Sequence, residues 1–483
     1  MLTVISKSGS TFTKNYSRRA VKNGYLVSRA NDVDSLNVKH WARESIAILI
    51  DNLTMAPRVH QDFSPMVQQA GDTVNTRQAA EFSTIRKTFN DDVTVQNATT
   101  TNVPVRLNQN VHVSFLIRDG EESLSFQDLT SLFMEPAMIS QAEFLDSVLC
   151  LQAYQFLQNS GGRLGQMDET NGKSYLLETR KVMNDNKAYG AGRNMILNTS
   201  ADATLLDIQQ FTDAQSVGDG GSTLASGMLR PKLGFNFAMS QNMPFINPMN
   251  SLVTGAINNA AGYPATTTSL TVDGLSAAIT AGTYFTVAGD NTPQQVVSTT
   301  GGSTPTAIVC SPGLRRAVAD NAVITLYPKS TVSATYTYDS NTNTGHQKAI
   351  AINAFSGNTP QVGQLVSFGS SLTKYAIVRV DSTTSIWLDR PLEATVTSGD
   401  TINLGPNGGY NFAFHRNALT LVSRPLAKPK TGTGALSEVV SVNNMSMRVV
   451  ITYDGNKQGH LVTLDGLFGV KVLDTDLGAV MYN

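Results

Sequence analysis

The longest helical pattern of hydrophobic residues lies between Phe126 and Leu157. Pro136 suits the first turn of a helix, where a missing N–H costs no hydrogen bond, and Gly161 with Gly162 marks a stop. Two adjacent apolar stripes run between these limits: Met138, Ala142, Leu145, Leu149 and Phe156, and beside them Phe144, Val148 and Leu151. A helix that is apolar around most of its circumference is buried. We therefore predict a central spine helix from Pro136 to Gln158.

Two extended runs precede this helix, Gly71 to Val95 and Thr101 to Arg118. In the second run, apolar residues alternate with polar neighbours, which is the period of a half-buried strand. These apolar positions are Val103, Val105, Leu107, Val111, Val113, Phe115 and Ile117. The first run is patterned less cleanly, with Phe82, Ile85 and Phe89 among basic residues. We predict a long two-stranded hairpin, and because a lone hairpin is marginal in water, we expect it to rest on something outside its own domain.

Shorter patterns alternate between helix and strand on either side of the spine. We expect helices at Asn37–Leu53, Tyr175–Met183 and Leu205–Phe211, and strands at Arg193–Leu197 and Leu233–Ala238. After residue 408, strands are expected at Asn411–Leu419, Met445–Tyr453 and Gly459–Val472. This mixture predicts an α+β fold, in which the C-terminal strands complete the sheet that the chain left near residue 250.

Between these parts, residues 251–406 are rich in Thr, Ser, Gly, Val and Asn and show scarcely any helical period. The stretch Ala281–Val287 aligns with Val362–Phe368. Leu314, Val318, Ile324, Leu326 and Pro328 align with Leu392, Val396, Ile402, Leu404 and Pro406 at a constant offset. The repetition predicts two related small β-barrels or sandwiches in tandem, and chance similarity among strand-rich sequences is the alternative.

Composition narrows the class of protein. Charged residues make up 15% of the chain, below the usual quarter, and the formal net charge is −1. These values favour large protein–protein contacts and give no general affinity for nucleic acid. Cys150 and Cys310 make no disulfide framework, and we expect buried free thiols. The apolar run after Met1 ends at Lys7, which is too early for a secretion signal. The best candidate for a membrane span, Ile46–Ile50, is far shorter than the ~20 residues that a span needs. We therefore expect a protein of the cytoplasm.

The first thirty residues contain no acid. Their basic residues are Lys7, Lys14, Arg18, Arg19, Lys22 and Arg29. Such an arm either lies against a partner or is a solvated terminus.

Local signatures of catalysis are missing. The six histidines show no metal-ligand spacing, and no GxSxG motif occurs. Asn171–Ser174 has the end of a phosphate-binding loop, but Met167 stands where its first glycine should fall. The glycines of Val217–Gly221 lack GxGxxG spacing and favour a loop. We therefore expect neither an enzyme nor a bound cofactor or metal ion.

Several soft motifs occur in a specific order: Gly71–Val74, the strand Val105–Phe115, the acidic turn Asp119–Glu121, the buried helix, Phe412–Ala418, and a C-terminal stretch from Arg448 to Val470. In that order they resemble the major capsid (coat) proteins of tailed double-stranded-DNA phages, in particular the short-tailed-phage coat branch with an inserted β-domain. Two positions depart from the family. Asn417 stands where the family usually has an acid, and Thr463 lies near the position of its arginine, so the resemblance does not carry that acid–arginine pair over to this chain.

The resemblance implies a Hong Kong ninety-seven-like fold. Its parts would be an N-terminal arm and short helix (1–57), an extended hairpin loop with peripheral-domain strands (58–125), the spine helix (126–162), the first part of the axial domain (163–250), an inserted β-domain of up to two barrels (251–407), and the return to both domains (408–483). The family carries one inserted barrel, whereas the insertion here looks doubled.

The function implied is that of a structural subunit of an icosahedral capsid. Pentamers and hexamers would form in the host cytoplasm with a scaffolding protein and a portal, and the resulting virion would hold the DNA genome through non-specific contacts only, without a membrane. The arm and the hairpin would carry the assembly contacts: Arg18, Arg19, Lys22, Arg86, Lys87, Asn90, Asp91 and Asp92. The alternative is a secreted or surface β-repeat protein of the adhesin type, which the Thr/Ser/Asn-rich repeats favour.

Overall fold

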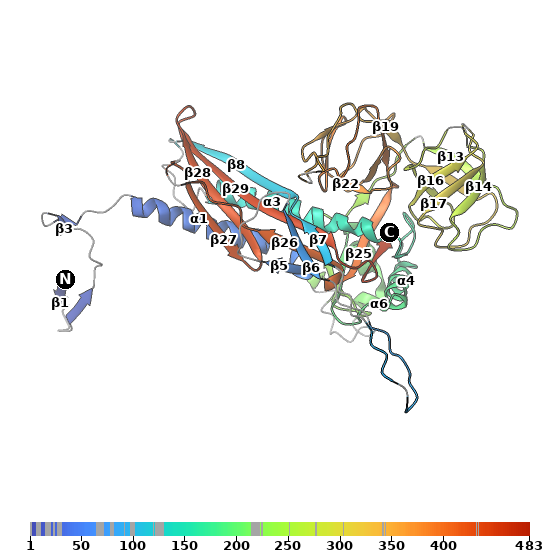
Figure 1. The fold of residues 1–483 in the computed structure, drawn as a ribbon, viewed down its shortest axis with the longest axis horizontal. Coiled ribbons are helices and arrows are strands. Elements are labelled where there is room, and N and C mark those ends of the chain that lie inside the picture. Colours follow the sequence, from blue (N-terminus) through green and yellow to red (C-terminus); the bar gives the residue numbers. More distant parts are fainter. Residues whose placement is uncertain are drawn as a thin grey trace.

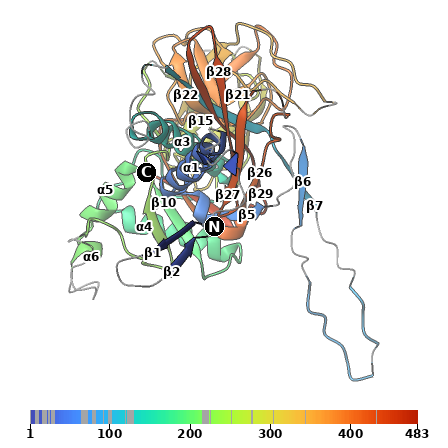
Figure 2. The ribbon, with the colours of Figure 1, turned by 90° about the vertical axis from the view of Figure 1, so that its left-hand side faces the viewer.

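A computed structural model gives the fold of the chain (Figure 1). The residues described are 2–5, 11–14, 21–22, 25–26, 31–63, 72–77, 82–90, 92–96, 102–118, 120, 130–213, 223, 226–250, 252–275, 278–302, 304–340, 342, 344–430, 432 and 434–483. The chain is α+β, as predicted. Two sheets and their helices form a body, and two β units stand on it (Figures 1 and 2).

The spine helix is present but shorter than expected. A π-helical turn, η2 (Thr130–Met134), leads into α3 (Glu135–Leu151), and a 3-10 helix, η3 (Gln152–Phe156), follows. The prediction of one α-helix to Gln158 was therefore wrong at its C-terminal end. The tighter winding of η3 accompanies the packing of Tyr154 on Tyr410 and of Phe156 on Phe412, with ring centroids 5.0 and 4.9 Å apart.

Three buried polar side chains on α3 and η3 bond to four other segments of the molecule. Gln141 Nε2 donates to the Leu464 carbonyl (2.7 Å). Asp146 accepts from the Met55 N–H (2.6 Å) and from the Ser240 hydroxyl (3.0 Å). Buried polar groups need partners, so each bond fixes one neighbouring segment on the spine. The third side chain, Gln152, points to the second β unit and is described with the site.

A twisted sheet, antiparallel except for the parallel pair of β26 and β5, lies along α1 (Asn31–Asp51) and α3. Its strand order is β27-β28-β29-β26-β5, and β8 pairs with β29. The bounds are β5 His60–Phe63, β8 Gln109–Arg118, β26 Leu419–Arg424, β27 Leu436–Val442, β28 Met445–Asp454 and β29 Gly459–Val472. A short 3-10 helix, η1 (Ala56–Arg58), precedes β5.

The alternation predicted for β8 is confirmed. Ile117 is buried, and Val111, Val113 and Phe115 pack against the core between exposed polar residues. Its partner was predicted wrongly, because β8 runs antiparallel to β29 and not to the first extended run. Alternation fixes which face of a strand is buried but not which neighbour binds its edge.

The second sheet has the order β11-β10-β25-β30-β9, and β12 pairs with β25. The bounds are β9 Ser160–Gly161, β10 Arg193–Leu197, β11 Asn236–Met239, β12 Phe245–Ile246, β25 Gly408–His415 and β30 Gly478–Tyr482. Another 3-10 helix, η4 (Arg416–Ala418), links β25 to β26. The pairing of β25 with β10 shows that the chain returns after residue 408 to the sheet it had left, as predicted.

Helices beside the second sheet differ from prediction in length. They are α4 (Gly172–Asp185), α5 (Thr199–Asp207) and α6 (Gln209–Thr212). The predicted helix Leu205–Phe211 is two helices, because Ile208 between them is extended (φ −68°, ψ 110°). The helix expected at Asn37–Leu53 begins six residues earlier, at Asn31.

Residues 253–404 form two β units in tandem. The first is a closed barrel of β13 Val253–Ile257, β14 Ser269–Asp273, β15 Tyr284–Val287, β16 Gln294–Thr300, β17 Ala307–Ser311 and β18 Val323–Leu326. The second is a six-stranded sheet of β19 Lys329–Thr331, β20 Ile350–Ala351, β21 Leu365–Phe368, β22 Tyr375–Ser382, β23 Ser385–Leu388 and β24 Thr401–Leu404.

Strand order is the same in both units. It reads β13-β18-β15-β16-β17-β14 in the first and β19-β24-β21-β22-β23-β20 in the second. The edges of the second unit meet at a bridge between Val332 and Ile352, where the Asn353 N–H donates to the Thr331 carbonyl (2.8 Å). We call the two units the first barrel and the second barrel.

Candidate assembly interface

A two-stranded hairpin projects from the body (Figure 2). Its base is β6 (Thr73–Arg77) paired antiparallel with β7 (Asn102–Arg106). Val105 and Leu107 are fully buried and pack in a small cluster with Val422 and Leu467 of the body. This cluster anchors the base, which explains how a hairpin that would be marginal alone keeps its position.

Beyond the base, the described residues 82–90 and 92–96 contain no strand ladder. The Gln96 side chain takes the place of a ladder pair, since its Oε1 accepts from the Ser83 N–H (3.0 Å) and its Nε2 donates to the Ser83 carbonyl. Five large apolar side chains are nevertheless exposed here: Phe82 67%, Ile85 50%, Phe89 101%, Val93 72% and Val95 84%. We call these five residues the hairpin apolar set. Apolar side chains concentrated on an exposed projection are typical of a surface that another molecule covers.

Four of the predicted contact residues lie on this segment. Arg86, Lys87, Asn90 and Asp92 are exposed. Sequence reasoning chose these polar residues and passed over the hairpin apolar set. The signal that could have identified the set is the recurrence of large apolar residues in a run that lacks the clean alternation of a half-buried strand.

The remaining predicted contacts belong to the N-terminal segment and the hairpin tip. Lys22 lies in β3 (Val21–Lys22), which pairs with β4 (Tyr25–Leu26). Arg18, Arg19 and Asp91 lie outside the described residues. Of the arm's predicted contacts only Lys22 is described, and Figure 1 shows its strand β3 at a distance from the hairpin.

The N-terminal segment extends away from the body at the end opposite the barrels (Figure 1). Its first strands, β1 (Leu2–Ile5) and β2 (Thr11–Lys14), pair only with each other among the described strands. The segment continues into α1, which is held to the body by buried Trp41, Ala42, Ile46 and Leu49. The hairpin and this segment are thus two projections with anchored bases.

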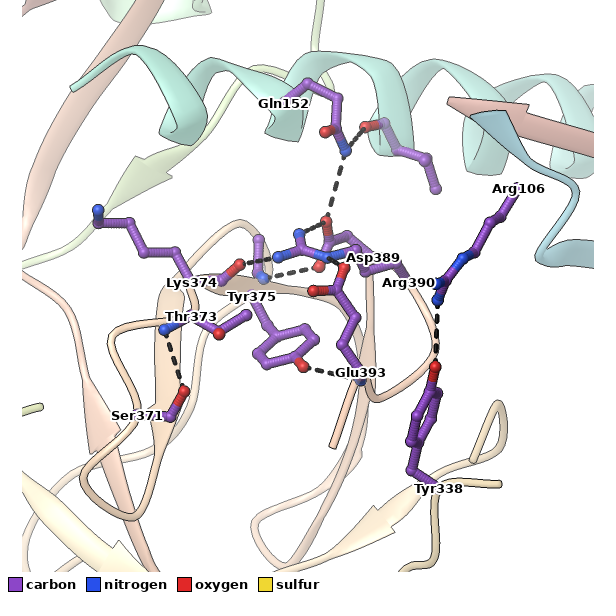
Figure 3. A network of polar contacts seen from close by, with 12 residues as sticks. Arg106, Gln152, Tyr338, Ser371, Thr373, Lys374, Tyr375, Asp389, Arg390 and Glu393 are labelled. Atoms are coloured by element: carbon purple, nitrogen blue, oxygen red, sulfur yellow. Dashed lines mark hydrogen bonds and ion pairs between the residues drawn. The ribbon is translucent and has the colours of Figure 1, made fainter. Parts of the chain in front are cut away.

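The second barrel docks on the spine through a buried acid (Figure 3). Asp389 Oδ1 accepts from the Ala376 N–H (2.9 Å), and its Oδ2 accepts from Arg390 Nη1 (3.0 Å) and from Gln152 Nε2 (3.5 Å). Arg390 is also bonded to Glu393 (3.0 Å) and stacks on Tyr375, 4.6 Å from the ring centroid. This network joins the C-terminal end of the spine to the second barrel.

The first barrel docks on the second sheet by different residues. Arg316 donates to the Gly162 carbonyl (2.9 Å) and pairs with Glu178. Arg315 Nε donates to the Ser160 hydroxyl (3.3 Å). Asp290 holds the loop of both arginines, accepting from the backbone N–H groups of Arg315 and Arg316. Desolvation by burial raises the pKa of Asp290.

Both cysteines of the chain are buried. Both cysteines are free thiols, as expected from the sequence. Burial raises the pKa of Cys310 to about 12 and that of Cys150 well above its ordinary value, so neither thiol is activated as a nucleophile.

The described residues contain no group of three His, Cys, Asp or Glu side chains placed to hold a metal ion. Among the described helices, none combines the length and the apolar character that crossing a membrane requires.

Comparisons with known proteins give structural matches only. The sequence matches no protein-family model and no curated protein. Solved structures similar to this chain include the capsid of the cyanophage P-SCSP1u (9% identity, 88% of this chain and 86% of that chain covered, TM-score 0.41). Others are the mature capsid of bacteriophage PhiM1 (9%, 89% and 86%, 0.39) and the capsid of Staphylococcus phage Andhra (8%, 89% and 86%, 0.38). All three are phage capsid structures with TM-scores below 0.5, and the function is therefore inferred from the chain's own geometry.

Proposed function

We propose that this chain is a structural subunit of an icosahedral viral capsid with a Hong Kong ninety-seven-like fold. Copies assemble into pentamers and hexamers that enclose a double-stranded DNA genome in the virion. Residues 251–407 are then an inserted domain, and the two sheets of the body are the peripheral and axial domains. A scaffolding protein and a portal take part in assembly, which occurs in the host cytoplasm.

One observation carries the proposal: the hairpin apolar set is exposed on an anchored projection. Burial of one such side chain is worth about 1.5–3 kcal/mol. The five side chains are 50–101% exposed, so this free energy becomes available when a second copy covers them. A closed shell repeats the same contact on every copy, because each subunit offers both a hairpin and a surface that receives one.

The test is to replace Phe82, Ile85, Phe89, Val93 and Val95 together by Ser in the full chain. Negative-stain microscopy and sedimentation would compare it with the unaltered chain, which we expect to form closed shells or polyheads. The variant should remain monomeric with an unchanged unfolding transition. The control replaces two exposed valines of the first barrel, Val297 and Val323, by Ser and should assemble normally.

Two results would contradict the proposal. Normal shells from the five-residue variant would remove the hairpin from assembly. An unaltered chain that stays monomeric and binds glycans would instead support a surface-binding protein.

A further inference from the structure

The outermost strand of the sheet along α1 and α3, β27, has an open edge. Its seven residues pair with β28 on one side, and no other described strand lies against them. No hydrogen bond joins their remaining backbone groups to another described segment. None of the seven residues is buried. Since every second residue of an antiparallel edge strand directs its N–H and C=O outward, β27 presents a row of unpaired donors and acceptors.

The features that usually protect an edge strand are missing from β27. Natural edge strands avoid pairing through Pro, bulges, short length or several charges. β27 contains no Pro, its register with β28 is unbroken over all seven pairs, and its only charged residue is Glu438. The carboxylate of Glu438 is balanced by Lys428, 3.1 Å away. The open edge is therefore able to accept another strand.

The sequence of β27, Leu-Ser-Glu-Val-Val-Ser-Val, is complementary to itself. We consider two copies of the strand that run antiparallel about a two-fold axis at Val439, the midpoint. Ser437 of one copy then lies opposite Ser441 of the other. Leu436 lies opposite Val442, and these two side chains, 42% and 41% exposed, cover each other. Such a pairing joins apolar with apolar and hydroxyl with hydroxyl, as cross-strand pairs prefer.

The pairing also keeps each side chain on the face that it already occupies, because directly opposite residues of an antiparallel pair point to the same face. Val440 packs against the main core. The even-numbered residues of β27 therefore face that core, and Ser437, Val439 and Ser441 face away from it. Glu438 lies opposite Val440 of the other copy, so no two like charges are directly opposed.

We propose that β27 is a contact between copies of this chain, in which the β27 strands of two subunits pair antiparallel about a two-fold axis at Val439. The contact is isologous, because each copy supplies the same edge. One strand pair is weak by itself, so separate subunits remain monomeric and the pairing persists where other contacts hold the copies together. In that respect the inference rests on the proposed function, but it does not involve the hairpin.

The test is cross-linking of the full-length chain at high concentration through introduced cysteines, with a short bifunctional thiol reagent and denaturing electrophoresis. Covalent trapping accumulates product even from a weak contact, whether or not closed shells have formed. Both native cysteines are buried and do not compete. V439C should give a covalent dimer, because residues directly opposite on paired strands have Cβ atoms about 5 Å apart.

S437C is the matched control on the same strand and the same face. With the axis at Val439, the two copies of residue 437 lie about 14 Å apart, beyond the reach of the reagent. S437C and S441C should each give roughly tenfold less dimer than V439C, because their thiols meet only by chance collision. The double variant S437C/S441C should restore the dimer, since each thiol then faces the other.

Two results would overturn the proposal. Absence of a V439C dimer would show that the two edges do not meet. Equal amounts of dimer from V439C and S437C would show random collision or another register. Either result would leave the proposed function standing if the five-residue hairpin variant still fails to form shells, because the two tests alter different segments.

Discussion

The two barrels have the same construction but different attachments to the body. The aligned core positions are buried to similar degrees in both: Leu314, Val318, Ile324 and Leu326 are 0, 5, 0 and 7% exposed, and Leu392, Val396, Ile402 and Leu404 are 1, 5, 0 and 0% exposed. Gly282 and Gly363 occupy equivalent turns with φ of 89° and 83°. In each case an added Cβ would lie within 3 Å of a neighbouring segment, so both turns require glycine.

The attachments show no such equivalence. The constant offset places Asp389, which docks the second barrel, at the position of Ser311 in the first. It also places Glu393 at the position of Arg315, so the charge is reversed. The comparison teaches that the repeat preserves the residues that fill a barrel, whereas the residues that dock each barrel differ because each meets a different part of the body.

The largest expected effect is on the two cores. Ile324→Ala and Ile402→Ala should each destabilise their own barrel by about 4 kcal/mol, because both side chains are fully buried. The barrels have separate hydrophobic clusters, so each lesion should remain local. Trp387 lies in the second barrel and the only other tryptophan is Trp41, so urea unfolding followed by fluorescence in a W41F background reports the second barrel alone.

Ile402→Ala should shift this transition, and Ile324→Ala should not. An equal shift from both would show that the barrels unfold as one unit. Val297→Ala, at a position 36% exposed, is the control and should change neither.

A smaller effect is expected at the docking acid of the second barrel. Asp389→Ala should cost about 3 kcal/mol, because it leaves Arg390, whose side chain is 13% exposed, without its only buried acidic partner, while the remaining partner, Glu393, is exposed. The control, Lys348→Ala, changes an exposed side chain of the same barrel and should cost under about 0.5 kcal/mol. Equal destabilisation of the two variants in the Trp387 unfolding assay would refute the role of Asp389 as the docking residue.

The smallest effect is the pH dependence of the first barrel. Since the folded-state pKa of Asp290 lies above its ordinary value of 3.8, the folded state binds this proton more tightly. The contribution of Asp290 to stability is therefore highest below pH 3.8 and falls as pH rises through the raised pKa. Asp290→Asn should remove this dependence, because the folded state of the variant no longer binds the extra proton, at most about one, that the folded wild-type chain holds.

The free energy of unfolding of the full chain, followed by circular dichroism between pH 4 and 7, gives the slope of stability with pH. Wild type and variant should differ in this slope by at most about one proton. Asp273→Asn, at an exposed strand end, is the control and should leave the slope unaltered. A slope that is the same in wild type and Asp290→Asn would contradict the prediction.

Local sequence pattern predicted those features that depend on the period of a single element. The spine, the buried face of β8 and the repeated core positions follow from where apolar residues recur. The predicted contact residues on the hairpin were chosen as polar side chains, and the hairpin apolar set, which lacks strand alternation, was not assigned to the contact. The predicted partner of β8 was wrong for a related reason, since the backbone groups that pair two strand edges are the same whatever the side chains are.

The sequence by itself determined an α+β chain with a buried helix and a strand-rich repeat, because burial of apolar side chains follows local periodicity. Only the tertiary structure decided which segments meet. Gln152 and Asp389 lie 237 positions apart, and Arg106 of β7 donates to the Tyr338 hydroxyl of the second barrel, 232 positions away. Such contacts depend on how whole elements pack, and no local pattern in the chain encodes that packing.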